Sequence, residues 1–223
     1  RGALARCDGV LSGYLGDAAA GDVVLDAVTR VRTYNDGALY CCDPVLGDDG
    51  EIYVGGDIVL FLRERAAPAA DILTPNQFEL EVLTDNTPNA LAGAPLGEII
   101  AAARKLIAPD RRTSTVLITS LDHAGLSPTD MAMAAVTETG AWLVTTPKLT
   151  FATPPHGAGD FCAALFCAAV RDGDAGSALS KMASAIYALL HETARLGSAE
   201  LALVAAQDIL VTPPKIFCAE SIL

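Results

Sequence analysis

The alternation of strands and helices is clearest at residues 70–83, whose sequence is ADILTPNQFELEVL. Apolar residues between turn-forming ones predict a short buried strand over residues 70–74. A helix is predicted directly after it, over residues 76–83. One strand–turn–helix unit of this kind is the repeating element of α/β folds.

The same unit recurs on both sides of residues 70–83. Before it, the sequence predicts a helix that begins at Asp17, a plausible N-cap residue, because valines and alanines then recur at helical spacing. Further strands are predicted at residues 7–12, 38–43 and 115–119, a turn-rich loop at 47–56, and further helices at 58–64 and 96–107.

The second half of the chain has a different order of predicted strands and helices. Residues 131–138 and 141–146 flank Thr139-Gly140, which predicts an antiparallel hairpin at the edge of the sheet. Helices are predicted from Gly157 to about Arg171, and over residues 177–195 and 200–210. The whole pattern predicts an α/β fold with a doubly wound, mostly parallel sheet flanked by helices. No internal linker or repeat interrupts it, so we expect a single domain over residues 1–223.

Composition excludes several classes of protein. Hydrophobic residues make up 52% of the 223 residues, which is incompatible with a disordered chain. The longest purely apolar run, residues 161–170, is about half of what a bilayer requires, so no membrane partner is expected. The net charge is −12, and no basic run exceeds the pair Arg111-Arg112. Binding to nucleic acid is therefore not expected either.

The six cysteines form no CxxC pair and lie mostly in apolar segments. They are typical of buried thiols in a reducing compartment, which predicts a cytoplasmic protein. The three histidines are too scattered along the chain to indicate a zinc site.

In parallel sheets, ligands bind at the carboxyl ends of the strands. Polar or small residues follow each predicted strand here, and any one group could be an ordinary turn or helix cap. Five such groups together favour a site: Ser12-Gly13-Tyr14, Asp43, Thr74-Pro75-Asn76, Thr119-Ser120 and Gly157–Asp160.

The turn Gly157-Ala158-Gly159-Asp160 precedes an apolar helix. Small residues let a ligand approach the backbone, and the first N–H groups of a helix are unpaired, so the turn could bind phosphate oxygens. Asp160 is either a general base for an attacking hydroxyl or a carboxylate that complements the helix dipole. No Walker loop, GxGxxG fingerprint or GxSxG elbow is present.

A second group consists of carboxylates near two strand ends: Asp43, Asp48, Asp49 and Glu79. Oxygen ligands of this kind suit Mg²⁺, which takes one or two protein carboxylates and keeps several waters. The alternative for Asp48-Asp49-Gly50 is a solvated turn.

Four segments of the chain resemble the signature segments of pyridoxal kinases, a branch of the ribokinase-like superfamily. They are residues 10–14 (VLSGY), 39–48 (LYCCDPVLGD), 71–79 (DILTPNQFE) and 157–160 (GAGD). The resemblance extends over nearly the whole chain in the same order, and it implies a ribokinase-like fold and a homodimer.

The resemblance also implies a reaction. Asp160 matches the family's catalytic base, which activates the 5′-hydroxyl of pyridoxal for attack on the γ-phosphate of ATP. The backbone of Gly157, Ala158 and Gly159 matches the anion hole for the transferred phosphoryl group.

The remaining roles follow by position in the same way. Asp48 and Glu79 match residues of the Mg²⁺ site, and Asp43 and Thr74 match positions near the metal, the ATP phosphates and a monovalent cation (K⁺ or Na⁺). Asn76 is similar to a residue that holds the metal–phosphate network, and Thr119 and Ser120 match a strand end that contacts ATP. Tyr14 matches an aromatic residue near the pyridine ring, and Tyr53 a loop tyrosine near the nucleotide phosphates.

The chain departs from the family pattern in three places. It starts at what resembles the family's third strand, so we expect it to lack the family's N-terminal strand and lid segment. Ala158 replaces the usual Thr, and His156 precedes the turn where relatives carry apolar residues; His156 either touches a ligand or is an exposed loop residue. Two alternatives therefore stay open: a related kinase that acts on hydroxymethylpyrimidine, and a shortened relative that binds nucleotide or vitamer without transferring phosphate.

Overall fold

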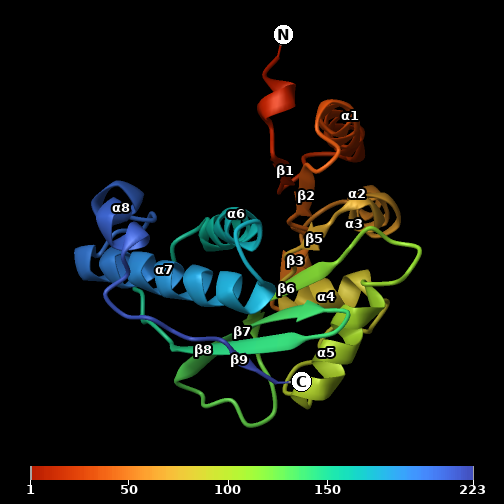
Figure 1. Ribbon diagram of the computed structural model, residues 1–223. Coiled ribbons are helices and arrows are strands. Elements are labelled where there is room, and N and C mark those ends of the chain that lie inside the picture. Colours follow the sequence, from red (N-terminus) through yellow and green to blue (C-terminus); the bar gives the residue numbers. More distant parts are fainter. Residues whose placement is uncertain (1, 223) are drawn as a thin grey trace.

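The computed structural model describes residues 2–222, which form an α/β fold around one seven-stranded sheet (Figure 1). The strands follow the order β1 (Gly9–Ser12), β2 (Leu39–Cys42), β5 (Ile72–Leu73), β6 (Thr115–Leu121), β7 (Asp130–Thr137), β8 (Ala141–Pro147) and β9 (Glu220–Ser221). Strands β1, β2, β5 and β6 pair in parallel, and the pairs from β6 to β9 are antiparallel. The mostly parallel sheet predicted from the sequence is confirmed.

Helices cover both faces of this sheet, as Figure 1 shows. One face carries α1 (Ala18–Tyr34), α2 (Gly56–Phe61), the π-helical turn η2 (Leu62–Ala66), α3 (Ala67–Ala69), α4 (Gln77–Leu83) and α5 (Leu96–Lys105). The other face carries α6 (Ala158–Val170), α7 (Ala175–Leu196) and α8 (Leu203–Val211). A short 3₁₀ turn, η1 (Leu4–Arg6), precedes β1.

Two hydrophobic clusters fill the space between the sheet and these two layers. Strand β6 contributes to both, because successive side chains point to opposite faces. Val116 and Ile118 pack with α1–α5, whereas Leu117 packs with α6–α8. All three side chains are fully buried, which explains the continuous apolar sequence of this strand.

Two strand pairs were not predicted. The turn-rich loop at residues 47–56 contains a small antiparallel pair, β3 (Gly47–Asp48) and β4 (Glu51–Ile52). The hairpin formed by β7 and β8 is present, but β9 pairs with β8 on its outer side and forms the edge of the sheet. Strands of two residues have no periodicity that a sequence pattern could reveal.

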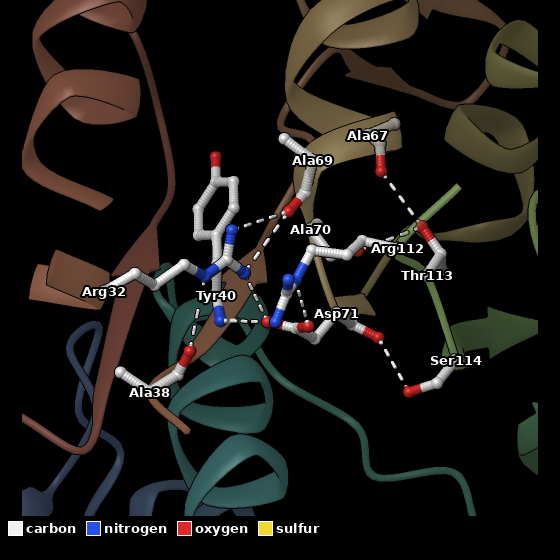
Figure 2. Close-up of polar contacts among 10 residues, drawn as sticks. All are labelled: Arg32, Ala38, Tyr40, Ala67, Ala69, Ala70, Asp71, Arg112, Thr113 and Ser114. Carbon is white, nitrogen blue, oxygen red and sulfur yellow. Dashed lines mark hydrogen bonds and ion pairs between the residues drawn. The ribbon is translucent and has the colours of Figure 1, made fainter. Parts of the chain in front are cut away.

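Asp71 anchors the start of β5, at the edge of the sheet opposite the strand ends that carry the predicted site (Figure 2). Its buried carboxylate accepts hydrogen bonds from Arg32 of α1 at 2.6 Å, from the backbone N–H of Tyr40 at 2.7 Å and from Arg112 at 2.9 Å. One side chain thus ties α1, β2 and the segment before β6 to the start of β5. This fixes the position from which β5 runs toward Thr74.

None of the helices within residues 2–222 is long and apolar enough to cross a membrane.

Candidate functional site

The carboxyl ends of the parallel strands lie side by side, as predicted. Backbone hydrogen bonds join neighbouring ends: the N–H of Asp43 donates to the carbonyl of Ser12 at 2.9 Å, and that of Thr74 to Cys42 at 3.2 Å. The N–H of Thr119 donates to the carbonyl of Pro75 at 3.0 Å. The polar residues that follow each strand are therefore collected at one edge of the sheet.

The N-terminus of α6 faces this edge without a side-chain cap. Its N-cap residue, Gly157, has φ +88°, a conformation that residues with a Cβ rarely adopt. No side chain accepts a hydrogen bond from the first turn. The leading N–H groups, which have no intrahelical partners, can therefore bind an anion.

Asp160, in the first turn of α6, lies beside the end of β1. A Cβ placed on Gly13 would lie 3.4 Å from Oδ1 of Asp160, so the carboxylate rests over this glycine. The side chain of Asp160 is exposed. Its charge also acts on Asp43, whose pKa it helps to raise. An exposed carboxylate therefore stands next to unpaired amides at the sheet edge.

Asp43 is a buried carboxyl group with one strong partner. The Thr74 hydroxyl donates to Oδ1 of Asp43 at 2.9 Å, which joins the ends of β2 and β5. Burial raises the pKa of Asp43 to about 6, and the charge of Asp160 adds to this shift. A cation at this position would favour the ionised form of Asp43.

Glu79 and Asn76 form a capping box at the start of α4. The side chain of Asn76 accepts from the N–H of Glu79 at 2.8 Å, and Glu79 Oε2 accepts from the N–H of Asn76 at 2.8 Å. Glu79 Oε1 also accepts from the N–H of Leu46 at 2.9 Å, and the Asn76 amide donates to the carbonyl of Gly47 at 2.9 Å. Both residues thereby hold the β2–β3 loop against α4.

Burial outweighs these hydrogen bonds and raises the pKa of Glu79 to about 8. The phenol of Tyr53 lies in the field of the same carboxylates, because burial, followed by the charges of Glu79, Asp48 and Asp43, raises its pKa. Asp48 itself is exposed, on β3. Within residues 2–222, no three side chains of His, Cys, Asp or Glu form a cluster that could hold a metal by themselves.

A cavity of about 230 Å³ opens beside the start of α6. It brings together four residues named in the sequence analysis: Thr119, Ser120, Ala158 and Gly159. Ser120 has φ +49°, unusual for a residue with a side chain, at an irregularity in the pairing of β6 with β7. Such strain is found at binding sites, where the surrounding structure maintains it.

The apolar wall of this cavity was not predicted from the sequence. The wall is formed by Met131, Met133, Leu149, Phe151, Ile186, Tyr187 and Leu190. In the sequence these residues cannot be told from core residues of strands and helices, because apolar periodicity is the same for both. The one available signal was the position of Leu149 and Phe151 just beyond the end of a strand.

Two residues from the sequence analysis stand apart from this group. Tyr14 follows Gly13 directly, but its side chain is 66% exposed. His156 is exposed and forms an isolated backbone bridge with Glu200.

Comparisons with known proteins show which family this chain resembles. The family profile described as phosphomethylpyrimidine kinase matches residues 5–203. A pyridoxal kinase PdxY from Rubrobacter xylanophilus is 48% identical over 217 residues, which cover 96% of this chain and 72% of the relative. Another from Deinococcus radiodurans is 46% identical and covers 100% of this chain and 74% of the relative.

A solved structure gives the same result. The pyridoxal kinase from Leishmania donovani in complex with ADP and ginkgotoxin superposes with a TM-score of 0.85 at 26% identity, covering 99% of this chain and 76% of that protein. Since identity, coverage and fold all agree, the chain belongs to the pyridoxal kinase family.

Proposed function

We propose that this protein transfers the γ-phosphoryl group of ATP to the 5′-hydroxyl of pyridoxal and related B6 vitamers, giving pyridoxal 5′-phosphate. The observation that carries the proposal is the position of Asp160 beside the uncapped N-terminus of α6, in a chain 48% identical to a pyridoxal kinase. A base and an anion site in contact are what phosphoryl transfer to an alcohol requires.

In this mechanism Asp160 accepts the proton of the substrate hydroxyl as the hydroxyl oxygen attacks the γ-phosphorus. The bond from the γ-phosphorus to the bridging oxygen breaks, and ADP leaves. The backbone N–H groups of residues 157–159 donate to the phosphoryl oxygens, where negative charge collects in the transition state. The apolar cavity next to Ala158 and Gly159 receives the nucleoside, and Thr119 and Ser120 line its polar side. Tyr14 borders the pyridine ring, next to Gly13, and Tyr53 borders the phosphates.

We propose that the carboxylates at the sheet edge hold Mg²⁺, with Asp48 and Glu79 as its protein partners. The residues fit the ion: Glu79 is buried with a raised pKa, Asp48 is exposed on β3, and no ion pair within residues 2–222 compensates either one. Mg²⁺ held there would offset the negative charge of the phosphates. Asp43 and Thr74 would bind a monovalent cation, and Asn76 would keep Glu79 and the β3 loop in place.

We further propose a single kinase domain over residues 1–223, a homodimer and a cytoplasmic location. Two clusters on the faces of one sheet support the single domain, and the six free cysteines support a reducing compartment. The exposed apolar side chain of Leu11, on the edge strand β1, is a candidate for burial in a dimer. Sedimentation of the purified protein tests the dimer.

Replacing Asp160 by Asn tests the mechanism. Asparagine keeps the size of the side chain but cannot take the proton, so we expect turnover of ATP and pyridoxal to fall about 10²–10⁴-fold while ADP still binds. Asp172→Asn, an exposed carboxyl just beyond the other end of α6, is the matched control and should keep its turnover. Near wild-type turnover in Asp160→Asn would show that Asp160 is not the base.

The same assay separates the second candidate function. The family profile carries the description phosphomethylpyrimidine kinase, so hydroxymethylpyrimidine is offered beside pyridoxal as the acceptor. Faster ATP consumption with pyridoxal than with hydroxymethylpyrimidine supports the proposal. Faster consumption with hydroxymethylpyrimidine assigns the chain to pyrimidine phosphorylation. Nucleotide binding with neither turnover identifies a non-catalytic relative.

A further inference from the structure

Lys148 is the one basic side chain among the fifteen residues that line the 230 Å³ cavity. It follows β8 directly, and its backbone N–H donates to the carbonyl of Thr129 at 2.7 Å. The backbone at Lys148 is therefore held in place, while its side chain is exposed at the cavity.

The ammonium group of Lys148 is not engaged by a carboxylate. None of the ion pairs within residues 2–222 includes it, although the chain has 27 acidic and 15 basic residues. The ionisable side chains collected at the strand ends are acidic: Asp43, Asp48, Glu79 and Asp160. A nucleotide that enters this cavity adds several negative charges, and Lys148 is the lining side chain that can offset them.

The sheet topology places Lys148 away from the point of transfer but on the same edge. Strand β8 runs in the same direction as β6, because each is antiparallel to β7. The residues at these two strand ends line the same cavity, since Thr119 and Ser120 of β6 and Lys148 after β8 all border it. Ala158 and Gly159 at the start of α6 line this cavity too, so a nucleotide whose γ-phosphate binds there leaves Lys148 to the phosphate nearest the ribose.

We propose that Lys148 is a nucleotide-binding residue whose ammonium group pairs with the α-phosphate of bound ATP or ADP. The proposal rests on the proposed function, since it takes the cavity as the nucleotide site. Lys148 then contributes to nucleotide affinity and leaves the proton transfer at Asp160 unchanged.

The test compares equilibrium binding of ADP, AMP and adenosine to the wild type and to Lys148→Met, with Mg²⁺ present. Loss of one charge-assisted contact should lower the affinity for ADP and for AMP about ten-fold each and leave the affinity for adenosine unchanged. The loss should shrink as salt is raised, because salt screens an exposed pair. Lys148→Arg should retain most of the affinity, since it retains the charge.

Lys105→Met is the matched control. Lys105 is exposed at the end of α5, on the opposite face of the sheet, and its loss should leave all three ligands unaffected. Thermal unfolding of each variant verifies that it is folded.

Three results for Lys148→Met would overturn the assignment of Lys148. The affinity for ADP and AMP could be unchanged, the affinity for adenosine could fall as much as theirs, or the affinity for ADP could fall while that for AMP does not. Each leaves the proposed function intact if the wild type binds ADP and phosphorylates pyridoxal. A wild type that binds no ADP overturns both proposals, and one that binds ADP without turnover removes only the kinase function.

Discussion

At Gly157 the backbone conformation and the proposed anion site depend on the same residue. The φ of +88° turns the chain so that α6 starts with its N–H groups free. A Cβ at this position would have ordinary contacts, the nearest being 3.5 Å from Cδ1 of Leu201. The requirement for glycine is therefore one of backbone conformation rather than of space.

Replacing Gly157 by Ala should lower the free energy of unfolding by about 1–2 kcal/mol, because alanine is strained at positive φ. Turnover should fall further than this loss of stability explains, since relaxation of the strain moves the first N–H groups of α6. Gly159→Ala is the comparison: this glycine has no positive φ, and a Cβ there would meet nothing within 4 Å. Chemical unfolding and kcat are measured for both; equal stability losses would contradict the argument.

The buried carboxyl groups predict how stability depends on pH in the absence of metal and nucleotide. Burial raises the pKa of Asp43 from 3.8 to about 6 and that of Glu79 from 4.5 to about 8. The folded protein therefore holds protons that the unfolded chain has already released. The stabilisation from these two groups should be fully present below about pH 4, and the free energy of unfolding should fall as the pH rises. Between pH 6 and 8, only Glu79 of this pair still causes that fall.

Glu79→Gln should remove most of the decline between pH 6 and 8, because glutamine stays neutral. Glu98→Gln, at an exposed position of α5, should retain it. Urea unfolding at several pH values measures both slopes. An unchanged slope in Glu79→Gln would show that Glu79 ionises normally in the folded protein.

Among the elements, β5 has the least structure of its own and depends most on its surroundings. It has two residues, Ile72 and Leu73, both buried between β2 and β6. Asp71 holds its start through two arginines and a backbone N–H (Figure 2), and the Thr74 hydroxyl holds its end to Asp43. The position of Thr74 at the site is therefore set at both ends of the strand.

Asp71→Ala should destabilise the fold by about 3–5 kcal/mol, because it leaves the partly buried charge of Arg32 without its carboxylate and the buried N–H of Tyr40 without its acceptor. Asp26→Ala is the control: its pair with Arg30 is 67% exposed on both sides and is worth at most about 1 kcal/mol. The midpoints of urea unfolding measure both. Similar losses in the two variants would mean that the contacts of Asp71 are solvated.

In the molecule as a whole, one sheet packs against two hydrophobic cores, one on each face. Leu80 of α4 lies in the cluster on one face and Leu179 of α7 in the cluster on the other, and both are fully buried. Strands β2, β5, β6, β7 and β8 each contribute side chains to both clusters, so neither core can be lost without exposing the other.

We therefore expect one cooperative unfolding transition for the whole chain, as a single domain requires. Leu80→Ala and Leu179→Ala should each shift this transition, by about 2–5 kcal/mol. Calorimetry of the two variants provides the measurement. Two separate transitions, each moved by only one of the variants, would instead indicate two folding units.

Much of the fold and of the candidate site could be predicted from local patterns. The strand over residues 115–119, the helix that begins at Asp17 and the glycine turn at residues 157–159 are all signalled by burial, capping and backbone chemistry that act within a few residues. The signature segments also identified the family. The strand pairs β3–β4 and β8–β9 could not be predicted, because strands of two residues exist only through their partners.

The residue types at the site, and the chemistry they can perform, follow from the sequence alone, since a carboxyl group or a glycine has its properties wherever it lies. The surroundings of these residues do not follow from the sequence alone. The rise in the pKa of Glu79, the apolar wall of the cavity and the place of Lys148 at that cavity arise from contacts between residues far apart in the chain. Only the folded sheet sets those distances, because burial and electric field depend on packing in three dimensions.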